Sequence, residues 1–135
     1  MGMRKIQIRR GREQMQLDDI MELLGQSYWA KERSREVTER ALDHSICYGA
    51  FLEDGTQIGL ARVVTDYATI LYLADVIVHK DYRGDGIGKA LLASIQEDAD
   101  VWGLLGVLFT KDAQTLYEKY GFVRDGERCM YKPRG

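Results

Sequence analysis

The sequence predicts one α/β domain with a mixed sheet, spanning residues 1–135. Its length corresponds to about one domain, and 45% hydrophobic residues can build a core without a disulfide framework. Strand-like and helical segments alternate in an order that is not a run of βαβ repeats. Residues 69–78 are almost wholly apolar, which favours a central strand covered by helices on both faces.

The first half of the chain predicts one strand, two helices and a hairpin. Residues 5–10 alternate in polarity, as in a half-buried strand. A helix follows at residues 17–24, with Gly25 closing it, and Ser34 is placed to cap a second helix that runs to Leu42. Asp54-Gly55 predicts a tight turn because glycine supplies the positive φ. The hairpin strands are expected at Ile46–Leu52 and Gln57–Thr65.

The second half predicts three strands and two helices. Thr69–Val78 is the central strand, and a glycine loop and a helix ending near Glu97 follow it. Leu104–Thr110 is a further strand, and Asp112 is placed to cap a helix at Ala113–Tyr120. Phe122–Tyr131 would be a last strand. The expected order is therefore β-α-α-β-β-β-α-β-α-β, about six strands with four helices.

Composition disfavours several functional classes. A net charge of -2 is unlike the basic surface typical of nucleic-acid binding. No run approaches the roughly 18 apolar residues of a membrane span, and no apolar segment follows the charged N-terminus as in a secretory signal. Cys47 and Cys129 are isolated, which is typical of reduced thiols in a cytoplasmic protein. With only two scattered histidines, His44 and His79, we expect no metal site.

The stretch from Asp75 to Ser94 combines a strand, a glycine loop and a helix. In this arrangement loop amides and the positive end of the helix dipole can hold a phosphate. A Walker A loop is rejected, because the spacing is one residue short and Ala90 replaces the hydroxyl residue. A dinucleotide fingerprint is disfavoured, because the glycine spacing is GxGxG and the loop lies in mid-chain.

Arg83-x-x-Gly86-x-Gly88 and residues 113–122 form two motifs that resemble the GNAT N-acetyltransferase superfamily. The stretches Ser27–Lys31 and Ala61–Asp66 resemble a subgroup of small bacterial GNAT proteins, usually of unassigned substrate. Arg83-x-x-Gly86-x-Gly88 is similar to motif A, whose amides wrap the pyrophosphate of acetyl-coenzyme A (acetyl-CoA). Residues 113–122, with Leu116-Tyr117 and Gly121-Phe122, are similar to a second motif of that superfamily. The resemblance covers nearly the whole chain. It implies a central, mostly antiparallel mixed sheet flanked by helices.

The resemblance also implies which residues contact acetyl-CoA. The amides of Val76 and Val78 would bind the acetyl carbonyl and the pantetheine arm. Thr110 stands where many relatives carry an asparagine that contacts this arm. The expected cofactor-binding residues are Val76, Ile77, Val78, Arg83, Gly84, Asp85, Gly86, Ile87, Gly88, Lys89, Thr110, Ala113 and Tyr117.

Two side chains are candidates for catalysis. Tyr117 would protonate the leaving thiolate, the alternative being a core tyrosine. Asp75 is the one charged residue of the central strand, and burial would raise its pKa toward that of a useful base. The alternative for Asp75 is a structural partner for a buried arginine or a tyrosine hydroxyl.

The acceptor is not identified by the sequence. Tyr28, Trp29, Tyr67 and Tyr72 would form an aromatic wall at the acceptor site, or pack in the core or at an interface. Asp66 would bind a cationic amine or serve as a turn residue. We expect an enzyme that acetylates a primary amine of a small molecule or peptide by direct attack. The alternative is a non-catalytic acyl-CoA sensor or partner-binding module. An edge strand near the C-terminus makes a homodimer possible.

Overall fold

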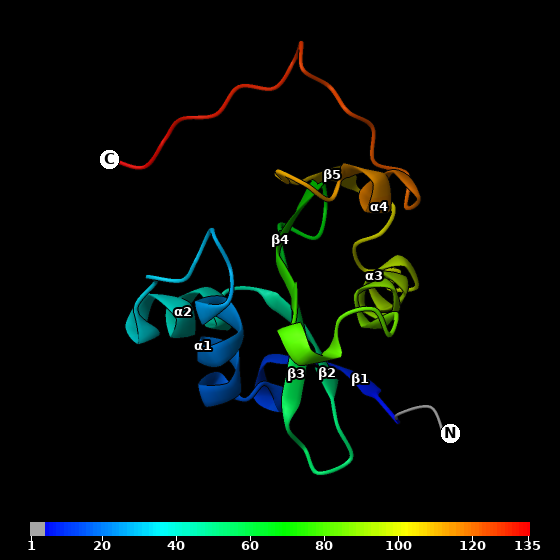
Figure 1. Cartoon of the computed structure of the whole chain (residues 1–135). Helices are drawn as coiled ribbons and strands as arrows, with labels where there is room; N and C mark the ends of the chain where they lie inside the picture. Colours follow the sequence, from blue (N-terminus) through cyan, green and yellow to red (C-terminus); the bar gives the residue numbers. More distant parts are fainter. Residues whose placement is uncertain (1–4) are drawn as a thin grey trace.

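The computed structural model describes residues 5–135 and contains one five-stranded sheet (Figure 1). The strands lie in sequence order, β1 to β5, and only the β4–β5 pair is parallel. The mixed, mostly antiparallel sheet that we predicted is therefore present. The strands are β1 (Gln7–Arg10), β2 (Ile46–Phe51), β3 (Gln57–Thr65), β4 (Ile70–Val78) and β5 (Leu105–Val107).

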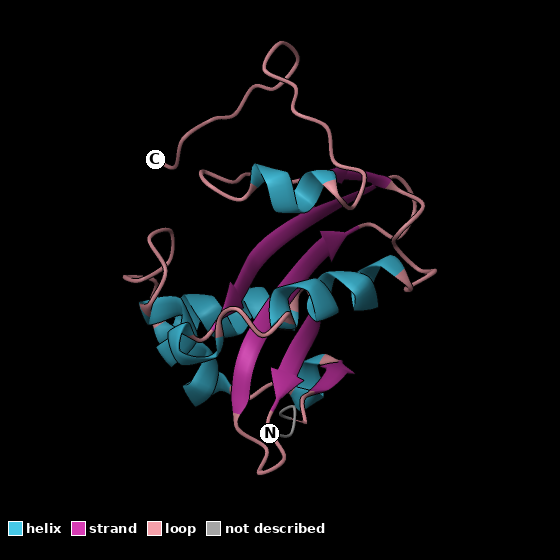
Figure 2. Ribbon diagram, turned by 45° about the vertical axis from the view of Figure 1, so that its right-hand side comes forward, coloured by secondary structure: helices cyan, strands magenta, loops and turns pink. Residues whose placement is uncertain are grey.

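Helices cover both faces of the sheet (Figures 1 and 2). Helices α1 (Leu17–Gly25) and α2 (Arg35–Asp43) lie on one face, where they share an apolar cluster with strand residues such as Phe51 and Ile77. Helices α3 (Ile87–Gln96) and α4 (Gln114–Glu118) contribute to the cluster of the other face. Two short 3₁₀ turns, η1 (Arg12–Gln14) and η2 (Lys80–Tyr82), complete the described elements.

Local signals in the first half of the sequence are confirmed. The Ser34 side chain accepts a hydrogen bond from the Val37 amide at 3.2 Å and so caps α2. Gly55 adopts φ of 92° in the turn that joins β2 to β3. These elements form as predicted because their determinants lie within a few residues of one another.

Three expectations for the C-terminal part are wrong. Residues 122–131 form no strand within the described chain, so the sheet has five strands and not about six. Strand β5 covers only Leu105–Val107 of the predicted Leu104–Thr110. Helix α4 has five residues, and its N-cap is Ala113 and not Asp112. The Thr110 hydroxyl oxygen accepts a hydrogen bond from the Ala113 amide at 3.0 Å, just before the helix begins. A strand forms only where a neighbouring strand offers its backbone, and no strand of the described sheet pairs with this segment.

Strand β4 has two features that position the functional site. It pairs with β5 only over Ile70–Tyr72, so the rest of its edge up to Val78 has no strand of residues 5–135 on that side. Its pairing with β3 is also interrupted, because the register passes from Leu60↔Ile77 to Arg62↔Ala74. The extra β4 residue is accommodated at Asp75, whose φ of 51° is rare outside glycine. This bulge reorients the Asp75 side chain.

Candidate functional site

The glycine loop connects the end of β4, through η2, to the N-terminus of α3. Gly84 and Gly86 adopt φ of 89° and 80°, which explains why these positions carry glycine. Gly86 is the N-cap of α3, and the first backbone hydrogen bond of the helix runs from the Ala90 amide to the Gly86 carbonyl. The amides that precede Ala90 in the first turn therefore have no partner within the helix and can bind an anion.

The free edge of β4 presents backbone amides beside this loop. The His79 amide donates to the Ile58 carbonyl of β3 at 2.8 Å. Because amides alternate in direction along a strand, those of Val76 and Val78 point to the opposite edge. Beyond Tyr72, β5 leaves that edge without a strand. The predicted amides are thus directed to the side on which the sheet is open.

Arg83 lies between this edge and the loop. Its Nε donates to the Val78 carbonyl at 3.0 Å, and the residue is exposed. The guanidinium is therefore held at the end of β4, next to the loop amides. Such a cation can make charge-assisted hydrogen bonds to phosphate.

Asp75 is the centre of a buried ion-pair cluster. Its carboxylate accepts hydrogen bonds from Arg33 Nη1 at 2.7 Å, Arg62 Nε at 2.9 Å and Trp29 Nε1 at 2.9 Å. Burial acts to raise the pKa of Asp75, but the hydrogen bonds and charges of the two arginines outweigh it, and the pKa is lowered. The expected rise in pKa is therefore wrong, and the Asp75 carboxylate pairs with two partly buried arginines.

The same cluster fixes the segment between α1 and α2. This segment carries Trp29 and Arg33, both of which bind Asp75. Ser27 is buried and accepts a hydrogen bond from the Ala30 amide at 3.0 Å, which closes a turn around Tyr28. Arg62 Nη1 also donates to the Ser45 hydroxyl at 3.0 Å. The bulge in β4 thus anchors a loop that is remote in sequence.

Tyr117 of α4 is buried, with 9% of its surface exposed. Burial is the main cause that raises the pKa of its phenol to about 12, and the nearby Tyr28 and Asp112 add to the rise. Among the residues that the structure describes, none is recorded as a hydrogen-bond partner of the Tyr117 hydroxyl. The phenol is therefore protonated at neutral pH and free to donate.

The predicted acceptor residues are only partly brought together. Tyr28 lies in edge contact with Trp29, with ring centroids 5.0 Å apart, and the Lys111 ammonium lies 5.4 Å from the Tyr28 ring centroid. The α1–α2 segment therefore reaches the loop before α4. The Tyr72 ring is in edge contact with the Phe109 ring, with the ring centroids 5.9 Å apart.

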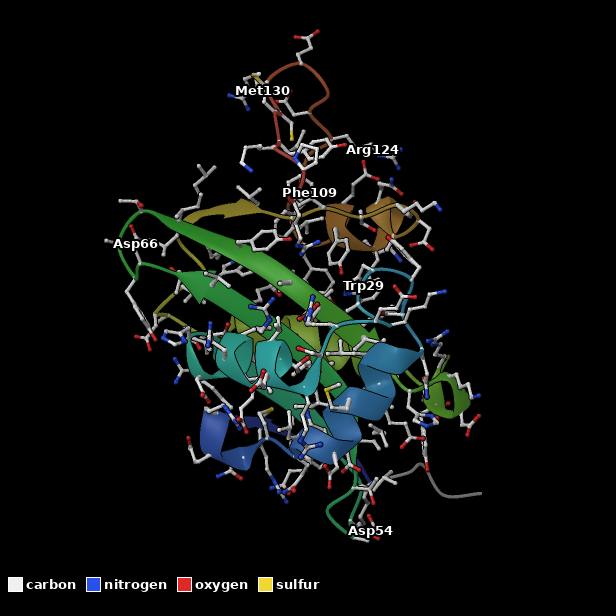
Figure 3. All side chains as sticks on the ribbon, turned by 90° about the vertical axis from the view of Figure 1, so that its left-hand side faces the viewer. Trp29, Asp54, Asp66, Phe109, Arg124 and Met130 are labelled. Atoms are coloured by element: carbon white, nitrogen blue, oxygen red, sulfur yellow. The ribbon has the colours of Figure 1, made fainter. Side chains whose placement is uncertain are left out.

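Asp66 does not join this group. Its carboxylate accepts hydrogen bonds from the Ala68 and Thr69 amides, at 2.9 and 2.8 Å, in the turn between β3 and β4. Hydrogen bonds from Thr69 are the main cause that lowers its pKa. Figure 3 shows Asp66 and Trp29 at opposite sides of the molecule. In this structure Asp66 therefore serves the turn between β3 and β4.

Four residues of the site were not predicted from the sequence. Arg33 and Arg62 both bind Asp75. Phe109 contacts Tyr72, and Lys111 contacts Tyr28. Asp75, a charged residue in an otherwise apolar strand, did indicate that a cation would lie beside it. The sequence did not indicate which of the arginines would supply that cation.

The cysteines and acidic residues offer no further centre in the part of the chain that is described. Burial raises the pKa of the Cys47 thiol to about 11, so Cys47 is not a thiolate at neutral pH. No cluster of three or more metal-binding side chains occurs in residues 5–135. No helix in the same range is long and apolar enough to cross a bilayer.

Comparisons with known proteins identify relatives of this architecture. Residues 43–124 match the family described as "Acetyltransferase (GNAT) domain". A crystal structure of a provisionally named GNAT-family acetyltransferase from Xanthomonas campestris pv. campestris is 36% identical, with a TM-score of 0.90 and coverage of 98% of this chain and 96% of its own. A GNAT-family acetyltransferase from Streptococcus pneumoniae is 26% identical, with a TM-score of 0.73 and coverage of 97% and 100%. A provisionally named acetyltransferase of Gibberella zeae is 29% identical over 82% of this chain and 75% of its own.

The sheet that opens beside β4, the glycine loop and the tyrosine of α4 define an acyltransferase-type fold. The family match spans more than half of the chain and includes all three features. The chain belongs to the GNAT acetyltransferase family.

Proposed function

We propose that this protein transfers an acetyl group from acetyl-CoA to a primary amine of a small molecule or peptide. The observation that carries the proposal is the position of two donor sets on the open side of β4. The amides of Val76 and Val78 point to this edge, and the glycine loop follows at its end. Tyr117 comes from the element that follows β5.

The residues of the loop fit a pyrophosphate. An ideal Cβ built on Gly84 or Gly86 would have no neighbour within 4 Å, so the loop faces open space and not packed side chains. The first-turn amides of α3 and the Arg83 guanidinium can donate to phosphate oxygens. The Thr110 hydroxyl can donate its hydrogen to the cofactor arm, because the bond from the Ala113 amide uses only its oxygen.

The proposed reaction is a direct attack of the amine on the thioester. The N–C bond forms, the C–S bond breaks, and the thiolate of coenzyme A leaves. The amides of Val76 and Val78 would hydrogen-bond the carbonyl oxygen as it gains negative charge, a contribution of about 2.7–4 kcal/mol where such donors have been removed. The high pKa of Cys47 argues against an acyl-enzyme on that residue.

Tyr117 is assigned to the leaving sulfur. Its pKa of about 12 exceeds the roughly 8.5 of a thiol, so complete proton transfer is uphill. We therefore assign it a hydrogen bond to the developing thiolate, followed by protonation from solvent. Because the pKa of Asp75 is lowered and two arginines bind it, we give Asp75 the role of holding the segment between α1 and α2 in place. The amine would then lose its proton to water.

The test is a coupled assay of thiol release from acetyl-CoA across a panel of primary amines, with binding of coenzyme A measured by calorimetry. We expect binding without an amine, and thiol release that depends on the amine. Binding with no release across aliphatic, aromatic and peptide amines would favour the non-catalytic sensor. No binding of coenzyme A would overturn the loop assignment and the sensor together.

A further inference from the structure

The charges in the cluster around Asp75 do not balance. The guanidinium groups of Arg33 and Arg62 both bind this carboxylate, and its third donor is the neutral indole of Trp29. The other recorded partner of Arg62 is the neutral hydroxyl of Ser45. Arginine stays charged, and the pKa of Asp75 is lowered, so the cluster holds two cations and one anion at neutral pH.

The side of the cluster that solvent reaches is its cationic side. The Asp75 side chain is 3% exposed, whereas those of Arg33 and Arg62 are 15% and 13% exposed. Arg33 binds Asp75 through Nη1 and Nη2, and Arg62 uses Nε and Nη1 in its recorded bonds. The remaining nitrogens, Arg33 Nε and Arg62 Nη2, have no recorded partner among residues 5–135. A ligand at this cluster therefore meets guanidinium donors, which suit a carboxylate.

The carboxylates that the sequence offered for a cationic acceptor are not available for one. Asp75 is held by the two arginines, and Asp66 is held by the amides of its own turn. Nearer to the candidate site, the charge of Lys111 is opposed by that of Asp112, which follows it in the chain. The unbalanced charge beside the open edge of β4 is therefore positive, and it favours an acceptor with an acidic group.

Apolar side chains continue from the cluster along the same face of the sheet. Side chains alternate between the two faces along a strand, so Val64 shares the face of Arg62, and Tyr72 is its partner on β4. Val64 is 39% exposed, and Phe109, whose ring contacts that of Tyr72, is 57% exposed. Figure 3 views this face, where α1 and α2 cover the lower part of the sheet and leave the part towards Phe109 uncovered.

The cationic cluster and this apolar face both adjoin the position of the thioester. Asp75 directly precedes Val76, whose amide points to the open edge of β4. Arg62 and Val64 are two residues apart on β3, which is about 7 Å along the strand. One small molecule can therefore place a carboxylate at the arginines and a ring on the apolar face while its amine stays near the β4 edge.

We propose that the acceptor is an aromatic amino acid, in which a carboxylate and an aromatic side chain flank the primary amine. The carboxylate accepts hydrogen bonds from Arg33 and Arg62. The ring lies on the face formed by Val64, Tyr72 and Phe109. The amine nitrogen attacks the acetyl carbonyl, the N–C bond forms as the C–S bond breaks, and the amine proton goes to water. This inference rests on the proposed acetyl transfer and narrows its acceptor.

The first experiment measures thiol release from acetyl-CoA with matched acceptors. L-phenylalanine and L-tryptophan are each compared with their carboxamides, which lack the negative charge. L-alanine lacks the ring, and spermidine represents cationic acceptors. We expect a KM for at least one of the two aromatic amino acids at least tenfold below those of its carboxamide, L-alanine and spermidine. An equal KM for the carboxamides, or the lowest KM for spermidine, would overturn the inference and leave acetyl transfer in place.

Calorimetry with the protein saturated with coenzyme A measures binding of the same probes without turnover. At least one of the aromatic amino acids should bind at least tenfold more tightly than its carboxamide. If this preference is found but no probe causes thiol release, the proposed reaction fails and the recognition of an aromatic amino acid stands. If neither amino acid binds, the inference is overturned whatever the assay of thiol release shows.

Arg62→Met tests the origin of the preference, because it removes one cation and leaves Asp75 paired with Arg33. The ratio of kcat/KM for the amino acid to that for its carboxamide should fall at least tenfold, and the calorimetric dissociation constant of the amino acid should rise by a similar factor. A merely structural role of Arg62 would lower kcat/KM for both probes and leave the ratio unchanged, which would overturn the inference. Arg12→Met is the matched control, since Arg12 pairs with Asp43 at 2.7 Å, and the ratio should not change.

Discussion

The Asp75 carboxylate and the Arg33 guanidinium form a two-bond ion pair, with Nη1 donating to Oδ2 at 2.7 Å and Nη2 to Oδ1 at 3.3 Å. The Asp75 side chain is only 3% exposed and that of Arg33 15%. The pair joins the bulge of β4 to the segment before α2. The contribution of this ion pair, and so of Asp75, to the free energy of unfolding can be measured.

Asp75→Asn should destabilise the fold. The variant leaves the partly buried cations of Arg33 and Arg62 without their anion. The expected loss is about 3 kcal/mol of unfolding free energy, at the low end of the range for broken buried pairs because both arginines keep some solvent contact. Urea denaturation at pH 7 measures it, with the exposed turn variant Asp54→Asn as control. Stability within about 0.5 kcal/mol of wild type, combined with lost activity, would restore the role of a base.

The contribution of Asp75 to stability should depend on pH. Because its pKa in the folded state is lowered, this contribution is fully present above the unfolded value of about 3.9 and is lost as pH falls through the folded pKa. The difference in unfolding free energy between wild type and Asp75→Asn should therefore be constant from about pH 5 upward and shrink in acid. A difference that grows below pH 4 would mean that the pKa is raised.

Tyr117→Phe should lower kcat by about 10²-fold at unchanged affinity for coenzyme A, because it removes a donor needed when the thiolate leaves. Tyr120→Phe is the matched control. Its hydroxyl donates to the Lys89 carbonyl at 3.2 Å, so the same deletion there should affect kcat little. In the wild type, ionisation of Tyr117 should cause no fall in kcat below about pH 10, since its pKa is about 12. An unchanged kcat for Tyr117→Phe removes this residue from the mechanism.

Gly86→Glu should abolish binding of coenzyme A in a folded protein, because it places a carboxylate at the proposed phosphate site. Gly55→Glu controls for backbone strain. Both glycines have positive φ, 80° and 92°, and an ideal Cβ on either would have no neighbour within 4 Å. Calorimetry should show lost binding for the first variant alone, while circular dichroism reports both as folded. Wild-type affinity for Gly86→Glu would contradict the loop assignment.

Local features of the sequence determined much of the fold. The apolar run of β4, the glycine positions before α3, the Ser34 cap and the turn at Gly55 act through residues that are close along the chain. Each was predicted and is present in the structure. The GNAT resemblance rests on the same kind of signal, because loop conformation and helix start are set by short spacings.

The tertiary structure decided what depends on distant partners. Asp75 could be a base or a structural anion until Arg33, 42 residues away, and Arg62 were placed beside it, because the balance between burial and neighbouring charge sets a carboxyl pKa. The partners of Asp66 lie in its own turn, where the Thr69 amide donates to its carboxylate. Residues 122–131 have a strand-like pattern but form no strand, since a strand needs the edge of another to satisfy its backbone. Sequence alone sets the tendency to extend, whereas the available edge decides whether a strand forms.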